Sequence, residues 1–299
     1  MKKFTSQEIK EFVSKPLFDE KVILNKDPSR PKISIVTPSY NQAQFLEKTI
    51  LSVLNQNYPN LEYIIIDGGS KDGSIDIIKK YEKYLSYWVS EPDEGQADAL
   101  NKGFRLASGE ICCFINSDDL FLPQALFKVA NEFVRAGHRD FFIGRTLIID
   151  RNENVIDLDP GLKPTFESLL LVGTNGFLQP STFWTKYVME KVGYLDTRFK
   201  FAFDYEFYLR MTQKFKAIAI GSFLSAFRYH KASKTSTMWE VKIQEDEILK
   251  RMYGADELPK YIKALLKHKY HARCLLYRAR SKAEYIFYYK FVSFLIGSS

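Results

Sequence analysis

The sequence has little cysteine and no long apolar run. Three cysteines occur among 299 residues, two of them adjacent (Cys112 and Cys113) and one near the end (Cys274). They form neither the paired C-x-x-C pattern of a zinc site nor a spaced disulfide framework, which favours a reducing compartment. No run reaches the ~18 to 20 apolar residues that span a bilayer, and the first residues lack a signal-peptide pattern. We therefore expect a cytoplasmic protein without a transmembrane helix.

Two common phosphate-binding fingerprints are also missing. The loop after Asp67 contains neither the G-x-x-x-x-G-K-[ST] cradle of P-loop enzymes nor the G-x-G-x-x-G turn of dinucleotide-binding proteins. P-loop kinases are thereby excluded, and a nicotinamide-dependent enzyme is not expected. Gly68 and Gly69 instead allow a ligand to approach the backbone closely.

The net charge of +7 gives little support for nucleic-acid binding. Residues 260–299 hold nine of the 43 Lys and Arg residues but only one of the 36 acids, Glu284. The rest of the chain holds 34 basic and 35 acidic residues and is nearly neutral. Because a nucleic-acid-binding domain carries its basic patch on its body, we expect no nucleic-acid partner.

Short β-branched apolar runs alternate with helical patterns over the first 120 residues, which is typical of a mostly parallel, Rossmann-like sheet flanked by helices. The predicted strands are 33–37, 63–67, 87–90 and 111–115, and the predicted helices begin near Asn41, Ser74 and Gln96. Beyond residue 120 a hairpin is predicted over 141–157, a helix over 204–213, and two strands over 217–220 and 223–229. We expect one α/β domain over 32–235, a lead-in over 1–31 and a C-terminal basic helical extension over 236–299.

Polar residues cluster where three of these strands end. The clusters are Thr37-Pro38-Ser39-Tyr40-Asn41, Asp67-Gly68-Gly69-Ser70 and Asn116-Ser117-Asp118-Asp119. In an open parallel sheet, ligands bind in the crevice at the carboxyl ends of the strands. Turn and cap chemistry explains any one cluster equally well. It explains the coincidence of three much less well, so a binding site is predicted at this edge.

Asp118 and Asp119 follow a fully apolar strand directly. Adjacent acids at the end of a buried strand repel each other unless a cation compensates, and hard oxygen ligands suit Mg²⁺ or Mn²⁺ bridging phosphates. A metal-diphosphate site is therefore predicted here. The alternative is a helix N-cap, with the helix beginning at Leu120-Phe121-Leu122-Pro123.

Several ordered motifs resemble the family 2 glycosyltransferases with the GT-A fold. They are Ile33 to Asn41, Ser52-Val53-Leu54-Asn55-Gln56, Ile66 to Ser74, and Glu91-Pro92-Asp93-Glu94-Gly95-Gln96-Ala97-Asp98-Ala99-Leu100-Asn101-Lys102-Gly103. The last of these is similar in particular to bacterial members that build surface polysaccharides. The resemblance covers roughly Lys32 to Thr235.

The resemblance implies an inverting transfer from a nucleotide-diphospho-sugar, assisted by Mn²⁺ or Mg²⁺. Residues 116–119 match the family's D-x-D region, with Asn116 in place of the first acid. Asp119 is expected to be the first metal ligand, with Asp118 contacting metal and ribose. His230 stands where some relatives carry a histidine ligand, and a structural role is the alternative. The expected donor-binding residues are Thr37, Pro38, Tyr40, Asn41, Asp67, Gly68, Asp93, Gln96, Asp98, Lys102, Asn116, Ser117 and Asp118.

The resemblance also places the catalytic base. Ala202-Phe203-Asp204-Tyr205-Glu206 matches the family's base segment, with Asp204 as the base and Glu206 as the fallback on the acceptor side. Aromatic neighbours are expected to raise the pKa of Asp204. A helix N-cap is the alternative role for Asp204. Gln179 is expected on the acceptor side, and Arg228 and Lys234 are candidates for neutralising the diphosphate.

The tail and the rival functions complete the expectations. Residues 260–282 interleave apolar and basic residues, which favours peripheral contact with the inner face of the cytoplasmic membrane and suits a lipid-linked or glycan acceptor. Packing of this helix on the catalytic domain or on a partner chain is the alternative. A nucleotidyltransferase and a non-catalytic sugar-nucleotide-binding module remain the competing functions. The acid triad Asp118, Asp119 and Asp204 argues against the latter.

Overall fold

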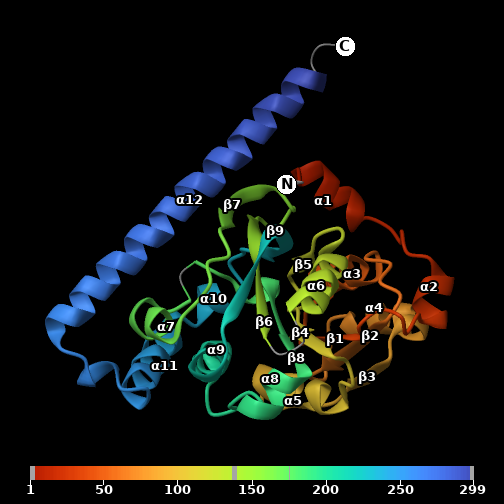
Figure 1. Ribbon diagram of the computed structural model, residues 1–299. Helices are drawn as coiled ribbons and strands as arrows, with labels where there is room; N and C mark the ends of the chain where they lie inside the picture. Colours follow the sequence, from red (N-terminus) through yellow and green to blue (C-terminus); the bar gives the residue numbers. More distant parts are fainter. Residues whose placement is uncertain (1–3, 137–139, 175, 297–299) are drawn as a thin grey trace.

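The computed structural model of the protein describes residues 4–136, 140–174 and 176–296. One mixed β-sheet runs through it. Its strands are β1 (Ile33–Ser39), β2 (Leu61–Asp67), β3 (Tyr87–Ser90), β4 (Ile111–Phe114), β5 (Leu120–Phe121), β6 (Phe141–Ile149), β7 (Val155–Asp159), β8 (Thr182–Thr185) and β9 (Ala217–Arg228). They follow the order β3-β2-β1-β4-β8-β6-β9-β5, and β7 pairs with β6 (Figure 1).

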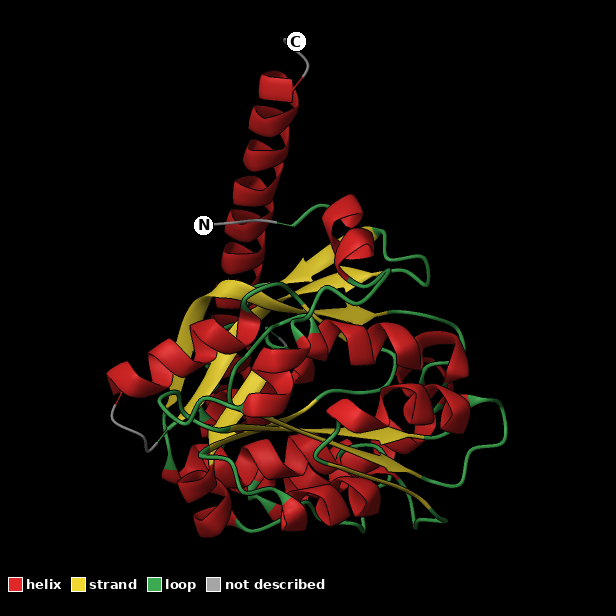
Figure 2. Cartoon of the chain, turned by 90° about the vertical axis from the view of Figure 1, so that its right-hand side faces the viewer, coloured by secondary structure: helices red, strands yellow, loops and turns green. Residues whose placement is uncertain are grey.

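Helices cover both faces of this sheet, as Figure 2 shows. The helices are α1 (Ser6–Phe12), α2 (Glu20–Asn25), α3 (Ala43–Leu54), α4 (Ser74–Tyr81), α5 (Gln96–Leu106), α6 (Ala125–Ala136), α7 (Phe166–Val172), α8 (Lys186–Val192), α9 (Phe203–Lys214), α10 (Lys234–Thr237), α11 (Trp239–Met252) and α12 (Lys260–Ile296), with short 3-10 turns at Glu82–Tyr84, Gln179–Ser181 and Ala255–Glu257. The predicted α/β class and helical C-terminal extension are confirmed.

The first half of the sheet is parallel, as predicted. β1 pairs with β2 and β4, and β2 with β3, all in parallel. Because both faces of β1 are buried, its side chains alternate between two cores. Ile33 and Ile35 pack with α3 and α6, whereas Val36 packs with α5 and α9. A Cβ at Gly103 would lie 2.4 Å from Val36 Cγ1, so this glycine lets α5 press closely on β1.

The second half of the sheet is mostly antiparallel. β8 runs antiparallel to β4, and β6 antiparallel to β8 and β7, which confirms the predicted hairpin over 141–157. The two strands predicted over 217–220 and 223–229 are one strand, β9, because it pairs along the whole of β6 and absorbs a register shift opposite Arg145.

Two predicted helix starts are wrong. Leu120 and Phe121 pair with Ala226 and Ser225 of β9, so a short strand follows the acids and α6 begins only at Ala125. Asp118 and Asp119 are therefore not helix caps. Gln42, not Asn41, is the N-cap of α3. Asn41 adopts a left-handed conformation (φ 52°) and its Oδ1 accepts a hydrogen bond from Lys71 N.

The two ends of the chain contact the domain differently. Phe4, Ile9 and Val13 of the lead-in are buried in a third apolar cluster with Leu147 and Phe223 of the sheet. α12 packs first on α7 and then, as far along as Lys282, on β7, and its last turns extend beyond the domain (Figure 1). Among the described residues, no helix is both long and apolar enough to cross a membrane.

Candidate active site

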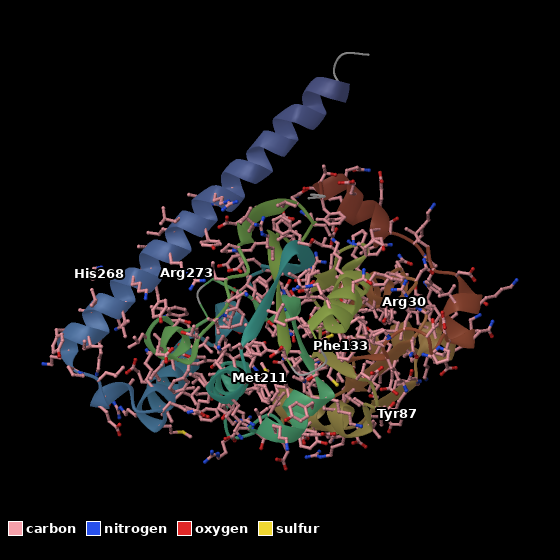
Figure 3. The ribbon with its side chains drawn as sticks, viewed as in Figure 1. Arg30, Tyr87, Phe133, Met211, His268 and Arg273 are labelled. Atoms are coloured by element: carbon pink, nitrogen blue, oxygen red, sulfur yellow. The ribbon has the colours of Figure 1, made fainter. Side chains whose placement is uncertain are left out.

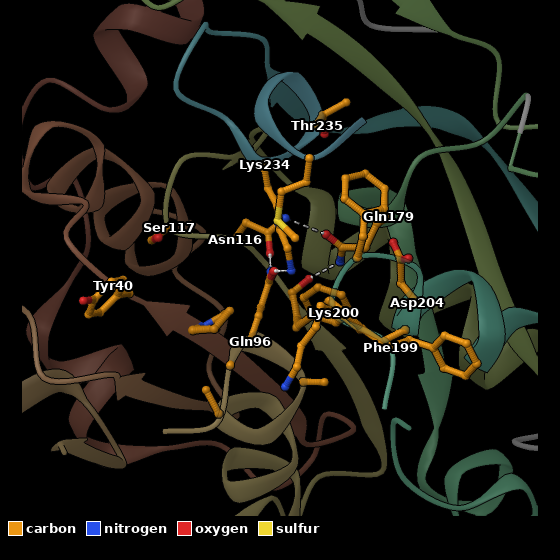
Figure 4. Close-up of a pocket in the computed structure, with 18 of the residues that line it drawn as sticks. Tyr40, Gln96, Asn116, Ser117, Gln179, Phe199, Lys200, Asp204, Lys234 and Thr235 are labelled. Carbon is orange, nitrogen blue, oxygen red and sulfur yellow. Dashed lines mark hydrogen bonds between the residues drawn. The ribbon is translucent and has the colours of Figure 1, made fainter. Parts of the chain in front are cut away.

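A cavity of about 980 Å³ opens at the carboxyl ends of the parallel strands. Figure 4 shows residues from widely separated segments meeting at it. Of the predicted donor and acceptor residues, those that line it are Pro38, Tyr40, Gly68, Asp93, Gln96, Asp98, Asn116, Ser117, Asp118, Gln179 and Asp204. Lining residues that the sequence analysis missed include Ser39, Gln42, Phe199, Lys200, Ser233 and Lys242. Ser39 Oγ and Gln42 Oε1 are buried polar atoms without a hydrogen-bond partner in the described chain.

Three predicted donor residues shape the loops around the cavity and do not line it. The buried Asp67 carboxylate accepts hydrogen bonds from Gly69 N (3.1 Å), Ser70 N (2.8 Å) and Ser90 Oγ (2.7 Å). Its oxygens are thus committed to holding the loop after β2. Thr37 Oγ1 lies 3.1 Å from Tyr63 Oη inside the core. Asn41 Oδ1 accepts a hydrogen bond from the backbone N–H of Lys71 (2.9 Å).

The absence of a side chain at Gly68 lets Asp93 and Tyr40 lie close to the backbone. A Cβ there would lie 2.6 Å from Asp93 Oδ2 and 3.3 Å from the Tyr40 ring. Asp93 Oδ1 accepts a hydrogen bond from Gly95 N (2.8 Å). The result is a narrow slot between an exposed aromatic ring and a carboxylate at one end of the cavity.

A chain of polar side chains crosses the floor of the cavity. Lys234 Nζ donates to Gln96 Oε1 (3.0 Å), and Gln96 Nε2 donates to Asn116 Oδ1 (2.7 Å). Asn116 Nδ2 lies 3.4 Å from Gln179 Oε1, and Gln179 Nε2 donates to Phe114 O (2.8 Å) (Figure 4). These bonds join the segments at the end of β4 and at the starts of α5 and α10 into one connected floor. Lys102 stays outside the cavity, where it pairs with Glu91 (3.0 Å).

The two predicted metal-binding acids differ in their surroundings. Asp118 lines the cavity, and its Oδ2 lies 3.0 Å from His230 Nε2. Asp119 is buried, and its carboxylate accepts hydrogen bonds from Arg228 N (2.8 Å) and Asn116 Nδ2 (3.3 Å). Burial and the neighbouring Asp118 charge raise the pKa of Asp119 well above its ordinary value. Among the described residues, no three His, Cys, Asp or Glu side chains form a metal site by themselves.

Arg228 supports this acid pair from the core and does not line the cavity. Its guanidinium is fully buried, lies 4.7 Å from the Phe45 ring centre and donates from Nε to Asp118 O (2.8 Å). Its Nη1 pairs with Glu153 Oε1 at 2.6 Å, and Glu153 Oε2 pairs with Lys48 at 2.8 Å. The β6–β7 hairpin is therefore tied to the acid loop by a buried charge network that no sequence motif indicated.

Asp204 faces the cavity from the first turn of α9. The N-cap of α9 is Ala202, so Asp204 does not cap the helix. Burial raises the pKa of Asp204 to about 6, against the lowering effects of a hydrogen bond from Tyr205 N and of the Lys234 charge. Glu206, the fallback, does not line the cavity. It is buried against Arg210 (2.7 Å) and accepts a hydrogen bond from Tyr253 Oη (2.8 Å).

Comparison with known proteins finds glycosyltransferases in both the family models and the curated sequences. The family model described as glycosyl transferase family 2 matches residues 34–186. An uncharacterized glycosyltransferase of Mycobacterium tuberculosis is 31% identical over 205 residues, which are 67% of this chain and 76% of that protein. A putative teichuronic acid biosynthesis glycosyltransferase of Bacillus subtilis, TuaG, is 39% identical over 102 residues, 33% of this chain and 40% of that protein.

Solved structures confirm the expected GT-A fold. Staphylococcus aureus TarS 1-349 in complex with UDP superposes with a TM-score of 0.58 at 18% identity, over 81% of this chain and 71% of that one. The mannosyltransferase PcManGT from Pyrobaculum calidifontis, in complex with GDP-Man and Mn²⁺, gives a TM-score of 0.55 at 18% identity, over 97% of this chain and 87% of that one.

The buried charge network predicts a large loss of stability in Glu153→Met. This variant leaves Arg228 buried without its partner, so we expect a decrease of about 3 to 5 kcal/mol in the free energy of unfolding, measured by urea denaturation. Glu247→Met is the control, because Glu247 pairs with Lys250 on an exposed helix face, and it should change stability by less than about 0.5 kcal/mol. Equal losses in the two variants would contradict this role for the network.

Proposed function

The chain belongs to glycosyl transferase family 2, and we propose that it transfers a sugar, with inversion, from a nucleotide-diphospho-sugar to a hydroxyl of a glycan or lipid-linked acceptor in surface polysaccharide synthesis. One observation carries the proposal: a single cavity is lined by the acid loop at one end and by a carboxyl with a raised pKa, Asp204, at the other. The similarity to TuaG, a putative teichuronic acid biosynthesis glycosyltransferase, supports the polysaccharide acceptor.

The donor nucleotide is assigned to the end of the cavity formed by β1 and β2. The exposed Tyr40 ring offers a flat apolar surface for a base, and Asp93 an acceptor for its N–H groups. The unpaired Ser39 Oγ and Gln42 Oε1 in the same wall are polar atoms that a bound nucleoside satisfies. Neighbouring structures with UDP and GDP-Man support a nucleotide-sugar donor.

A divalent cation, Mn²⁺ or Mg²⁺, fits the donor set at the acid loop. Asp118 lines the cavity with its Oδ2 3.0 Å from His230 Nε2, and Asp119 is the buried neighbour whose pKa is raised by burial and by the Asp118 charge, a charge that a cation would offset. Asp118 would hold the cation from the cavity side, and diphosphate oxygens would share it. When bound, the cation neutralises the charge that develops on the leaving diphosphate.

Asp204 acts as the general base. Its carboxylate takes the proton of the acceptor hydroxyl while that oxygen bonds to the anomeric carbon and the bond from this carbon to the diphosphate oxygen breaks. Attack from the face opposite the leaving group inverts the anomeric configuration. Lys234 lies between the two ends of the cavity, where its positive charge faces both Asp204 and the diphosphate position. Gln179 is assigned to the acceptor side.

α12 is proposed to contact the membrane surface. Tyr261, Leu265, Leu275 and Leu276 are each at least 64% exposed and fall within an arc of about 100° on the helix, away from the domain. In Figure 3, His268 lies on the outer side of α12 and Arg273 on the side facing the domain. Basic residues flank the apolar arc, as in helices that lie on anionic bilayers. This arrangement supports peripheral association on the inner face of the cytoplasmic membrane.

Asp204→Asn tests the base. We expect kcat for sugar transfer to fall by on the order of 10²- to 10⁴-fold while nucleotide affinity is retained. Because the base must be ionised, the wild-type rate should fall as the pH drops through about 6, and this acid limb should be lost in the variant. Asp76→Asn, at an exposed site on α4, is the control. An unchanged acid limb in Asp204→Asn would assign the base elsewhere.

Asp119→Asn tests the cation site. The amide keeps an oxygen for Arg228 N but removes the charge, so the gain in UDP, GDP or dTDP affinity on adding Mn²⁺ should shrink at least about tenfold, measured by calorimetry. Asp93→Asn is the matched control, because it lines the same cavity away from the proposed ligands. It should leave the ratio of affinities with and without Mn²⁺ unchanged. The same ratio in Asp119→Asn and wild type would exclude this ligand.

Liposome flotation tests the membrane contact. The full chain should float with vesicles containing anionic lipid and less so in high salt. Leu275→Glu combined with Leu276→Glu should abolish flotation, whereas Val134→Glu, at an exposed apolar site on α6, should not. Equal flotation of the wild type, the double variant and Val134→Glu, or no flotation of the wild type, would contradict the membrane contact.

A further inference from the structure

A carboxylate from α11 holds the segment that precedes the proposed base. Glu245 is buried, and its Oε1 accepts a hydrogen bond from Lys200 N (2.6 Å). Its Oε2 accepts hydrogen bonds from Phe201 N (2.8 Å) and Ala202 N (2.7 Å). One side chain thus binds three consecutive backbone amides directly before α9. Glu245 lies within residues 236–299, the segment expected to be an extension.

These bonds satisfy backbone N–H groups that would otherwise lack a hydrogen-bond acceptor. Amides at and before a helix start have no intrahelical partner, and a side chain at the N-cap usually satisfies one of them. Ala202 is the N-cap of α9 and has no side-chain group to offer. Glu245 takes over the neighbouring amides from a distant helix, and the negative charge is favourable beside a helix N-terminus. Asp204, two residues beyond the last of these amides, lines the cavity and accepts a hydrogen bond from Tyr205 N (2.7 Å).

The same contact fixes a second cavity residue. Lys200 lines the cavity, and its Nζ donates to the backbone oxygen of Glu94, another lining residue (2.9 Å). α11 itself is anchored through the buried Leu249, which packs in the same apolar core as α9. Glu245 therefore connects a packed helix to both Lys200 and the start of α9, and it is not itself among the residues that line the cavity.

We propose that Glu245 is a positioning residue for the acceptor half of the reaction, which holds Asp204 and Lys200 in place through the backbone of residues 200–202. This inference rests on the proposed glycosyl transfer. It predicts that loss of the three hydrogen bonds reduces turnover but spares the donor nucleotide, because the donor end is formed by β1, β2 and β4 on the far side of the polar floor.

Glu245→Gln is the test, because the amide nitrogen then opposes backbone N–H groups. We expect kcat for transfer to fall by about ten- to a hundredfold, the KM for the donor and the affinity for the nucleotide to stay within about twofold, and the ratio of donor hydrolysis to transfer to rise. Glu247→Gln, on the exposed face of the same helix, should behave as wild type. Should Glu245→Gln not fold, Glu245→Asp, which keeps the charge but not the reach, is measured in the same way.

Val129→Ala separates positioning from stability. Val129 is buried on α6 in the apolar core that does not contain α9 and α11, so this variant should lower the melting temperature with a kcat close to wild type. If Val129→Ala loses as much kcat as Glu245→Gln, or if Glu245→Gln equals Glu247→Gln, the positioning role is wrong. If the wild-type protein transfers no sugar from any nucleotide-sugar, the proposed function itself fails, which is a different result.

Discussion

Two adjacent carboxylates at the end of a buried strand are the constraint on which the rest of the structure depends. Asp118 and Asp119 follow β4 in the middle of the sheet, where desolvation and mutual repulsion disfavour two negative charges. The fold compensates from behind, through the Arg228 backbone and guanidinium. The cavity side is where a cation and a diphosphate are proposed to bind. β9 carries Arg228 and the β6–β7 hairpin carries its partner Glu153, so both elements contribute to this compensation.

The segment before α9 also depends on a charged side chain from a distant helix, Glu245 of α11. Asp204, the proposed base, lies in the first turn of α9, and Glu245 binds the backbone amides that precede this helix. Both ends of the site therefore rely on a charged residue contributed from outside the loop it stabilises. The hydrogen-bonded floor from Lys234 to Gln179 connects the two ends of the cavity.

The sequence predicted the parallel half of the fold well, because β-branched runs and helical periodicity are local signals. Most of the residues that it assigned to the site line the cavity, since strand ends meet at one edge of a parallel sheet. It misplaced the helix after Asp119, because pairing of Leu120 and Phe121 with β9 overrides their helical pattern. It assigned Thr37, Asn41, Asp67 and Lys102 to the donor. The structure places Thr37 against Tyr63 in the core, Asn41 and Asp67 in loop-holding hydrogen bonds, and Lys102 in a pair with Glu91 outside the cavity. Glu153 and Glu245 were beyond its reach, because their partners lie 75 and 43 to 45 residues away.

A crystal structure grown with Mn²⁺ and a nucleotide-sugar, with anomalous diffraction recorded for manganese, tests the central claim most directly. The account predicts one manganese peak within coordination distance of Asp119, Asp118 or both, the base beside Tyr40, and the anomeric carbon facing Asp204. A nucleotide bound outside this cavity, or a diphosphate placed away from the acid loop with no manganese peak there, would contradict it.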